Sequence, residues 1–83
     1  MRELVLYHTL GCHLCELAKE QIEPLLSDYQ LLMKEVDIAD DPALLERYGI
    51  RIPVIRLNAT INELDWPFDT LEVQRFLDAN IAF

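Results

Sequence analysis

Two cysteines three positions apart constrain this chain most, because they fall where a short strand is expected to give way to a helix. Residues 4–8 form an apolar, β-prone run that ends before Gly11, and helical spacing begins at Cys12. Cys12 is therefore expected at a helix N-terminus, where unpaired backbone N–H groups and the helix dipole favour negative charge. Cys15 lies one turn further in and is expected to be more covered.

This position predicts a reactive Cys12. A thiol whose pKa falls from about 8.5 to about 6.5 changes from roughly 3% to roughly 75% thiolate at pH 7. The thiolate is the nucleophile in thiol–disulfide exchange, so Cys12 is the expected attacking group. Cys15 is then the resolving thiol that breaks a mixed disulfide, and the pair is predicted to act as a reversible dithiol.

Three other interpretations of the pair stay open. A structural crosslink over so short a loop contributes only about 2 kcal/mol or less, against roughly 3 kcal/mol for a loop of about 15 residues. A zinc site needs two more ligands, and only His8 and His13 offer strong nitrogen donors. A buried, inert pair is the third interpretation, because free cysteine often packs as a small core residue. We expect no bound metal and no resident cofactor.

Each histidine also has two interpretations. His13 lies between the thiols, where an imidazolium would stabilise the Cys12 thiolate and raise the reduction potential of the pair. Alternatively, it is an exposed side chain at a helix start, where the dipole slightly disfavours a cation. His8 lies in the expected first strand and is interpreted as a core or edge residue rather than as a ligand or base.

Hydrophobic periodicity divides the chain into alternating strands and helices. Strands are expected at residues 4–8, 31–38, 50–57 and 60–64, and helices at 12–26, at 42–48 and from Asp69 onward. Pro24 should kink the first helix or end its regular part. Asp41 is the expected N-cap of the second helix and Gly49 its left-handed C-cap. Asp69 opens the last helix through a capping-box pattern.

This order, β-α-β-α-β-β-α, predicts an α/β fold with a four-stranded mixed sheet flanked by three helices. A crossover helix between the first two strands makes them parallel, and a turn near Asn58 and Ala59 makes the last two antiparallel. Eighty-three residues provide one core, so residues 1–83 are expected to form a single domain.

The charge of the chain excludes some partners. Seven basic and fifteen acidic residues give a net charge of −8, which repels nucleic acid and anionic membrane surfaces. No apolar run approaches the roughly 20 residues of a membrane span. The residues after Met1 become polar too quickly for a signal peptide. We therefore expect an intact cytoplasmic protein that binds neither nucleic acid nor membrane. We also expect it to be a monomer.

Several motifs together point to a family. They are Cys12-His13-Leu14-Cys15 after the first strand, Ile52-Pro53 at a later strand, and stretches at 36–38, 41–42, 48–54 and 66–69. With them the chain resembles the thioredoxin superfamily, and within it a family of short glutaredoxin-like proteins with a CxLC-type motif and a largely unassigned role. The resemblance implies a thioredoxin/glutaredoxin fold. It also implies a thiol–disulfide oxidoreductase that acts on protein or low-molecular-weight disulfides.

The resemblance further implies a cis peptide bond before Pro53. Such a bond would turn the Ile52 backbone toward Cys12 and offer its N–H and C=O groups to an extended substrate. The alternative is that Pro53 has no role in substrate binding and is simply a proline at the first residue or edge of a strand, where proline is tolerated. Together with Ile52 and Pro53, the residues expected to support the cysteine pair are Gly11, His13 and Leu14.

Substrate contacts are expected from Trp66, Asp69 and Thr70. At Asp69 and Thr70 the start of the last helix offers donors that suit a carboxylate such as that of glutathione, the expected candidate co-substrate, although the Asp69 side chain competes for them. If Trp66 contacts substrate, it lines a peptide-binding groove. The alternative is that Trp66 packs in the core. Glutaredoxins that bind glutathione typically carry a basic residue before the first cysteine and a Gly-Gly pair before the last helix, which residues 8–11 and 62–69 lack. The alternative function is a non-catalytic module that binds a partner, a metal or a cluster.

Overall fold

The computed structural model describes residues 2–58 and 60–81 of the chain. Its strands are β1 (Arg2–His8), β2 (Leu31–Asp37), β3 (Val54–Leu57) and β4 (Glu63–Asp65). Its helices are α1 (His13–Leu26), α2 (Pro42–Tyr48) and α3 (Thr70–Asn80). The predicted order β-α-β-α-β-β-α is confirmed.

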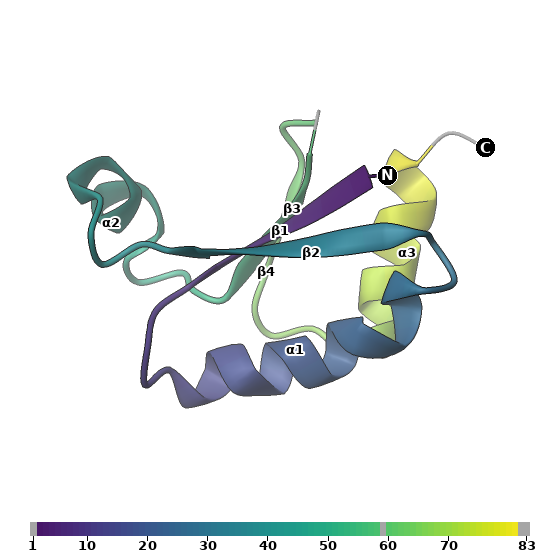
Figure 1. Cartoon of the computed structure of the whole chain (residues 1–83), viewed down its shortest axis with the longest axis horizontal. Helices are drawn as coiled ribbons and strands as arrows, with labels where there is room; N and C mark the ends of the chain where they lie inside the picture. The colour runs from purple at the N-terminus through teal and green to yellow at the C-terminus, as the bar shows by residue number, and fades with distance from the viewer. Residues whose placement is uncertain (1, 59, 82–83) are drawn as a thin grey trace.

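The four strands form one mixed sheet in the order β2-β1-β3-β4. Strands β1 and β2 are parallel, as the crossover through α1 requires, while β3 is antiparallel to both β1 and β4. Helices α1 and α3 pack on one side of the sheet, and α2 lies at the far end from α3 (Figure 1). The mixed sheet flanked by three helices is confirmed.

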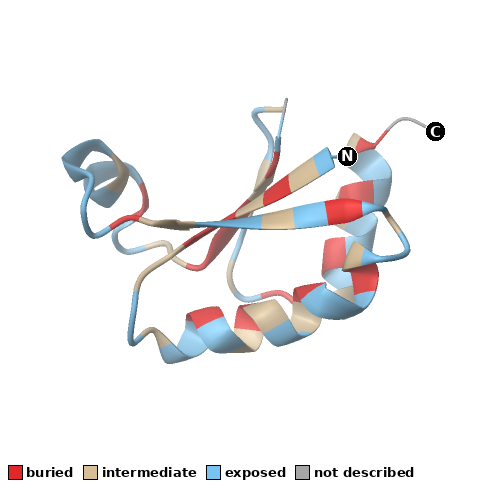
Figure 2. Cartoon of the chain, in the orientation of Figure 1, coloured by how far each residue is buried: buried red, intermediate tan, exposed pale blue. Residues whose placement is uncertain are grey.

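Alternation along the strands divides the buried side chains between two clusters. The larger cluster contains Leu4 and Leu6 of β1, together with Ile22 of α1 and Leu77 of α3. The smaller cluster contains Tyr7 and its neighbours on the α2 side. Successive residues of β1 thus face opposite sides of the sheet, and Figure 2 shows the buried positions gathered along the strands and on one face of α1 and α3.

Two strands differ from their predicted bounds, and α1 ends at Leu26 as predicted without stopping at Pro24. Helix α1 continues past Pro24 to Leu26, and its penultimate residue, Leu25, is buried in the larger cluster. Strand β3 begins at Val54 instead of residue 50, because the preceding residues form a turn in which two N–H groups donate to the Tyr48 carbonyl. Strand β4 covers residues 63–65 instead of 60–64. The predicted turn falls partly on Ala59, which lies outside the described residues.

Gly49 follows α2 directly, but the prediction of a left-handed conformation is wrong. Its φ of −49° and ψ of −41° are right-handed, and its N–H donates to the Leu45 carbonyl at 2.9 Å as another helical residue would. Glycine is favoured here because there is no room for a side chain: a Cβ would lie 2.5 Å from the Leu45 carbonyl oxygen. The predicted N-cap, Asp41, is confirmed: its carboxylate accepts from the N–H groups of Ala43 and Leu44.

Candidate active site

Cys12 is the N-cap of α1. Its Sγ accepts a hydrogen bond from the Cys15 backbone N–H at 3.1 Å, and its carbonyl accepts from the Glu16 N–H at 3.3 Å. The sulfur therefore occupies the place of a capping oxygen, facing the amides that the first helical turn leaves unpaired. Gly11 immediately before it has a φ of +77°, a left-handed value that favours glycine where the loop turns into the helix.

The two cysteines are joined by a disulfide, with Cα atoms 5.2 Å apart. Cys12 is half-buried, whereas Cys15 is fully buried. An open depression of about 270 Å³ lies at this end of α1, lined by Gly11, Cys12, His13 and Glu16. One sulfur of the pair can thus be reached from solvent, and the other is covered by protein.

Three side chains close to Cys12 in the sequence are exposed. His13 is the first residue of α1. Leu14, between the cysteines, retains 44% of its accessible surface, and Leu10, two positions before Cys12, retains 83%. The surroundings of Cys12 are therefore partly apolar.

The loop before β3 lies at the same end of the sheet as the cysteine pair. Val54 pairs with Tyr7, near the point where β1 ends and the chain turns toward Cys12. The Ile52–Pro53 peptide bond is cis, as is Trp66–Pro67. The Pro53 carbonyl accepts from the Trp66 N–H at 3.0 Å, which ties this loop to the segment after β4.

The Ile52 backbone differs from the prediction in one respect. Its N–H already donates to the Tyr48 carbonyl at 3.1 Å, because the chain closes a turn directly after α2. Its half-buried side chain packs against the smaller core cluster. Of the two backbone groups expected to meet a substrate, the N–H is therefore engaged within the protein.

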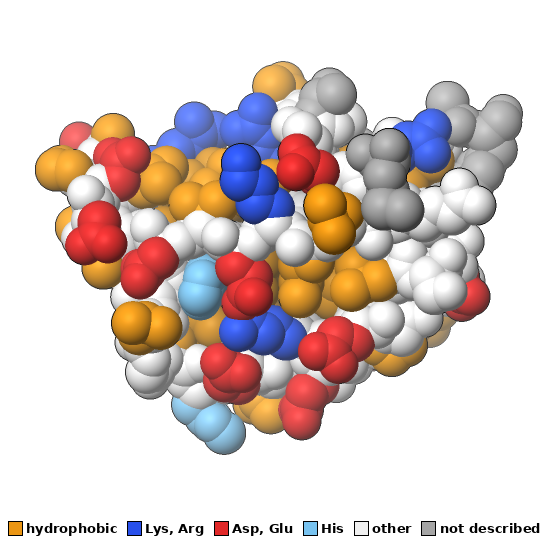
Figure 3. Space-filling model, in the orientation of Figure 1, with side chains coloured by type: hydrophobic (Ala, Val, Ile, Leu, Met, Phe, Trp, Pro, Cys, Tyr) orange, Lys and Arg blue, Asp and Glu red, His pale blue; other side chains and the backbone are white. Residues whose placement is uncertain are grey.

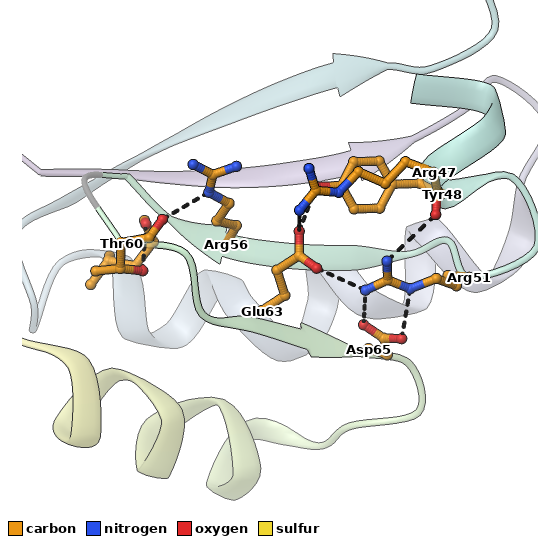
Figure 4. Close-up of polar contacts among 8 residues, drawn as sticks. Arg47, Tyr48, Arg51, Arg56, Thr60, Glu63 and Asp65 are labelled. Carbon is orange, nitrogen blue, oxygen red and sulfur yellow. Dashed lines mark hydrogen bonds and ion pairs between the residues drawn. The ribbon is translucent and has the colours of Figure 1, made fainter. Parts of the chain in front are cut away.

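A polar network that the sequence analysis missed holds this loop in place. Arg51 donates to both carboxylate oxygens of Asp65, at 3.0 and 2.9 Å, and to Glu63 at 2.8 Å (Figure 4). The Tyr48 hydroxyl donates to Glu63, and the Tyr48 ring stacks on that of Tyr7 with 4.1 Å between centroids. The available signal was the i, i+2 spacing of the two acids, which places them on one face of β4.

Charges in this network shift the pKa values of its members. Burial and the hydrogen bond to Glu63 raise the pKa of Tyr48 to about 12. Burial alone would raise the pKa of Glu63, but hydrogen bonds from Tyr48 and Arg51 outweigh it and hold the pKa below its ordinary value. The Arg51 guanidinium lowers the pKa of Asp65. Both carboxylates are stabilised in their charged form.

A second charged cluster lies on the other side of the sheet, between α1 and β2. The Lys19 ammonium is 2.5 Å from Glu35 and 3.4 Å from Glu16, and the hydrogen bond to Glu35 raises the pKa of Lys19. His8, with a side chain only 12% exposed, has its Nε2 4.0 Å from Glu35. His8 thus lies at the end of β1, beside this cluster.

The other expected contact residues lie at the start of α3. The Asp69 carboxylate accepts from the Glu72 N–H at 2.8 Å, so the predicted capping box is confirmed on its Asp69 side. The Thr70 N–H donates to the Gln21 side chain at 2.9 Å. Trp66 packs on the larger core cluster. Trp66, Asp69 and Thr70 do not line the depression at Cys12, and two of the donors at this helix start are occupied.

The described part of the chain has neither a cluster of metal ligands nor a helix that could span a membrane. Among residues 2–58 and 60–81, no three His, Cys, Asp or Glu side chains converge closely enough to hold a metal ion. Within the same residues, no helix has the length and apolar character needed to cross a membrane.

Comparison with known proteins identifies the family. The model of the glutaredoxin-like domain, DUF836, matches residues 3–78. The chain belongs to this family. A solution structure of the protein XcR50 from X. campestris shares 38% identity with this chain, and the match covers 100% of both chains with a TM-score of 0.81. A solution structure from Nitrosomonas europaea shares 26% identity over 90% of this chain and 89% of that one, with a TM-score of 0.77.

More distant structures support the fold of this glutaredoxin-like protein. A mutant thioredoxin from Halobacterium salinarum is 17% identical, covers 99% of this chain and 76% of that one, and gives a TM-score of 0.76. At this identity the likeness concerns the fold alone, and it confirms the predicted thioredoxin fold. No curated protein matches the chain.

Proposed function

We propose that this protein is a thiol–disulfide oxidoreductase. In its reduced form, the Cys12 thiolate attacks a substrate disulfide, forms a mixed disulfide and expels one substrate thiolate. Cys15 then loses its proton and attacks the Cys12 sulfur, which releases the second substrate thiol and closes the Cys12–Cys15 disulfide. An external thiol or dithiol returns two electrons to the pair. Each cycle therefore converts one substrate disulfide into two thiols.

The capping position of Cys12 is the observation that supports this proposal. Its sulfur already accepts the Cys15 N–H at 3.1 Å, so a thiolate formed there would find a donor in place. A helix N-terminus favours negative charge and lowers the pKa of a thiol. Exposure supports the division of roles, because Cys12 is accessible and Cys15 is not.

The proposal extends to partners and location. The substrate is a disulfide in a protein or the disulfide of a low-molecular-weight thiol, with glutathione as a candidate co-substrate. The protein works as a cytoplasmic monomer without a resident cofactor, and it binds neither nucleic acid nor membrane. The net charge of −8 supports the last point, since polyanions are repelled.

Trapping the mixed disulfide tests the mechanism. In a Cys15→Ser variant the first step can occur and the second cannot, so incubation with a disulfide substrate should leave one adduct on Cys12, visible by mass spectrometry. Cys12→Ser is the matched control and should form none. If Cys15→Ser forms no adduct with any disulfide and Cys12 titrates as an ordinary thiol, the proposal is wrong.

A non-catalytic binding module is the second candidate. It is favoured by the engagement of the Ile52 N–H with Tyr48 and of the Thr70 N–H with Gln21, since both were expected to hold substrate. Turnover that disappears in Cys12→Ser would contradict this candidate. Metal analysis of the purified protein tests its variant in which Cys12 binds a metal or cluster.

A further inference from the structure

Charge near the redox pair is negative. Glu16 lines the depression beside Cys12, and its side chain is 70% exposed. The nearest cation on the same helix, Lys19, is 2.5 Å from Glu35 and 3.4 Å from Glu16, so one ammonium is shared by two carboxylates. This group retains a net charge of about −1, since one cation cannot neutralise two anions.

The surface around this group is also negatively charged. Helix α1 also carries the exposed residues Glu20 and Glu23. Figure 3 shows mostly acidic side chains on the α1 side of the face drawn, with both imidazoles among them. Arg51 and Arg47 belong to the separate network with Glu63 and Asp65 (Figure 4). An anionic group near Cys12 would therefore meet carboxylates, and a cationic one would be attracted.

Apolar surface completes this environment. Leu10 and Leu14, close to Cys12 in sequence on either side, are both exposed. Apolar contacts contribute binding free energy, whereas charge complementarity contributes orientation and association rate. A partner that matches both features has apolar and basic side chains beside its disulfide.

We propose that the depression at Cys12 selects disulfides flanked by positive charge and apolar groups, as in a protein segment rich in Lys or Arg, over anionic disulfides such as that of glutathione. Glu16 is the residue that sets this preference. The inference rests on the proposed function, because it concerns the substrate of the same exchange reaction.

Three small disulfides that differ in charge test the preference. Cystamine is a dication, 2-hydroxyethyl disulfide is neutral and dithiodipropionate is a dianion. The fully reduced protein is mixed with each disulfide at constant pH, and oxidation of its two thiols is followed in a single turnover. The protein supplies both electrons, so no other reductant is present. Each rate constant is divided by that for a free neutral thiol, which removes differences in intrinsic disulfide reactivity.

We expect the normalised rate constant for the dication to exceed that for the dianion by about tenfold at low salt. The ratio should fall toward one as the salt concentration approaches about 1 M, where the screening length is only about 3 Å. Glu16→Gln should lower the ratio about threefold. Because the ratio compares two substrates of one protein, a changed Cys12 pKa cancels.

Glu23→Gln is the matched control, because it removes the same charge from α1 at a position that does not line the depression. It should change the ratio less than Glu16→Gln does. Equal rates for the three disulfides, or a ratio that Glu16→Gln leaves unchanged, would overturn the inference alone. If the reduced protein reacts with none of them beyond the Cys12→Ser level, the proposed function fails as well.

Discussion

At the scale of single residues, Arg51 connects the loop before Pro53 to strand β4. Its guanidinium pairs with both oxygens of Asp65, a geometry that fixes orientation as well as distance. The same side chain reaches Glu63, which also accepts from Tyr48. One arginine thus links three elements near the candidate site.

The network predicts a loss of stability in acid. The pKa values of Glu63 and Asp65 lie below their ordinary values of 4.5 and 3.8 in the folded protein, so the unfolded chain binds more protons in this range. Their contribution is present above the ordinary values and is lost as pH falls through the lowered ones. We expect the free energy of unfolding, measured in urea, to fall below about pH 4.5.

Arg51→Leu is the variant that checks this prediction. Without the guanidinium, the two carboxylates should titrate closer to their ordinary values, and stability should depend less on pH below about 4.5. A pH dependence identical to that of the unmodified protein would show that Arg51 does not control these groups.

Gly49→Ala tests the tight approach after α2. The new Cβ would lie 2.5 Å from the Leu45 carbonyl oxygen, so the backbone must shift. We expect a loss of about 1–3 kcal/mol in thermal or urea unfolding. Glu46→Ala, at an exposed position of the same helix, should change stability by less than about 0.5 kcal/mol. Equal effects of the two variants would argue against this steric explanation.

Local chemistry made the caps and the cysteine pair predictable. Cys12, Asp41 and Asp69 each act on N–H groups two or three positions away, so sequence spacing alone identifies them. The contact between Arg51 and Asp65 crosses 14 positions and depends on how β4 pairs with β3. The i, i+2 spacing of the two acids places them on one face of β4 but does not indicate which cation they meet, which is why the network was missed.

At the scale of elements, α3 begins with a carboxylate cap that is readily tested. Asp69→Ala removes the acceptor of the Glu72 N–H and should destabilise the protein by about 1 kcal/mol. Asp69→Asn keeps an acceptor and should lose much less. Thermal unfolding monitored by circular dichroism measures both. If alanine and asparagine destabilise the protein equally, the cap contributes little.

Element order was predictable, while strand ends were not. The hydrophobic spacing and the Asp41-Pro42 helix start predicted a helix over residues 42–48. Helix α2 has these bounds, because both signals are local. β3 was predicted four residues too long, since residues 50–53 look β-prone but form a turn closed on Tyr48. The competing turn depends on α2 ending beside them, which the β propensity of the segment does not encode.

At the scale of the whole molecule, neither of the two hydrophobic core clusters includes the disulfide. The larger cluster joins β1 and β3 to α1 and α3 through fully buried side chains such as Leu6, Ile22 and Leu77. These contacts connect distant parts of the chain, whereas the crosslink spans three positions. The fold should therefore persist when the pair is reduced.

Reduction tests this expectation. Loss of a crosslink across so short a loop should cost about 2 kcal/mol or less, or a fall in Tm of at most about 15 °C for a domain of this size. A thiolate stabilised at the helix start would make the fall smaller. Thermal unfolding with and without a dithiol measures it. Unfolding at room temperature on reduction would contradict the prediction.

The complete burial of Cys15 has a consequence for how the oxidised pair is reduced. A solvent thiolate cannot reach a sulfur with no accessible surface, so it can attack the disulfide only at the sulfur of Cys12. That attack forms a mixed disulfide between Cys12 and the incoming thiol and expels the Cys15 thiolate. Reductant and substrate should therefore compete for the same sulfur.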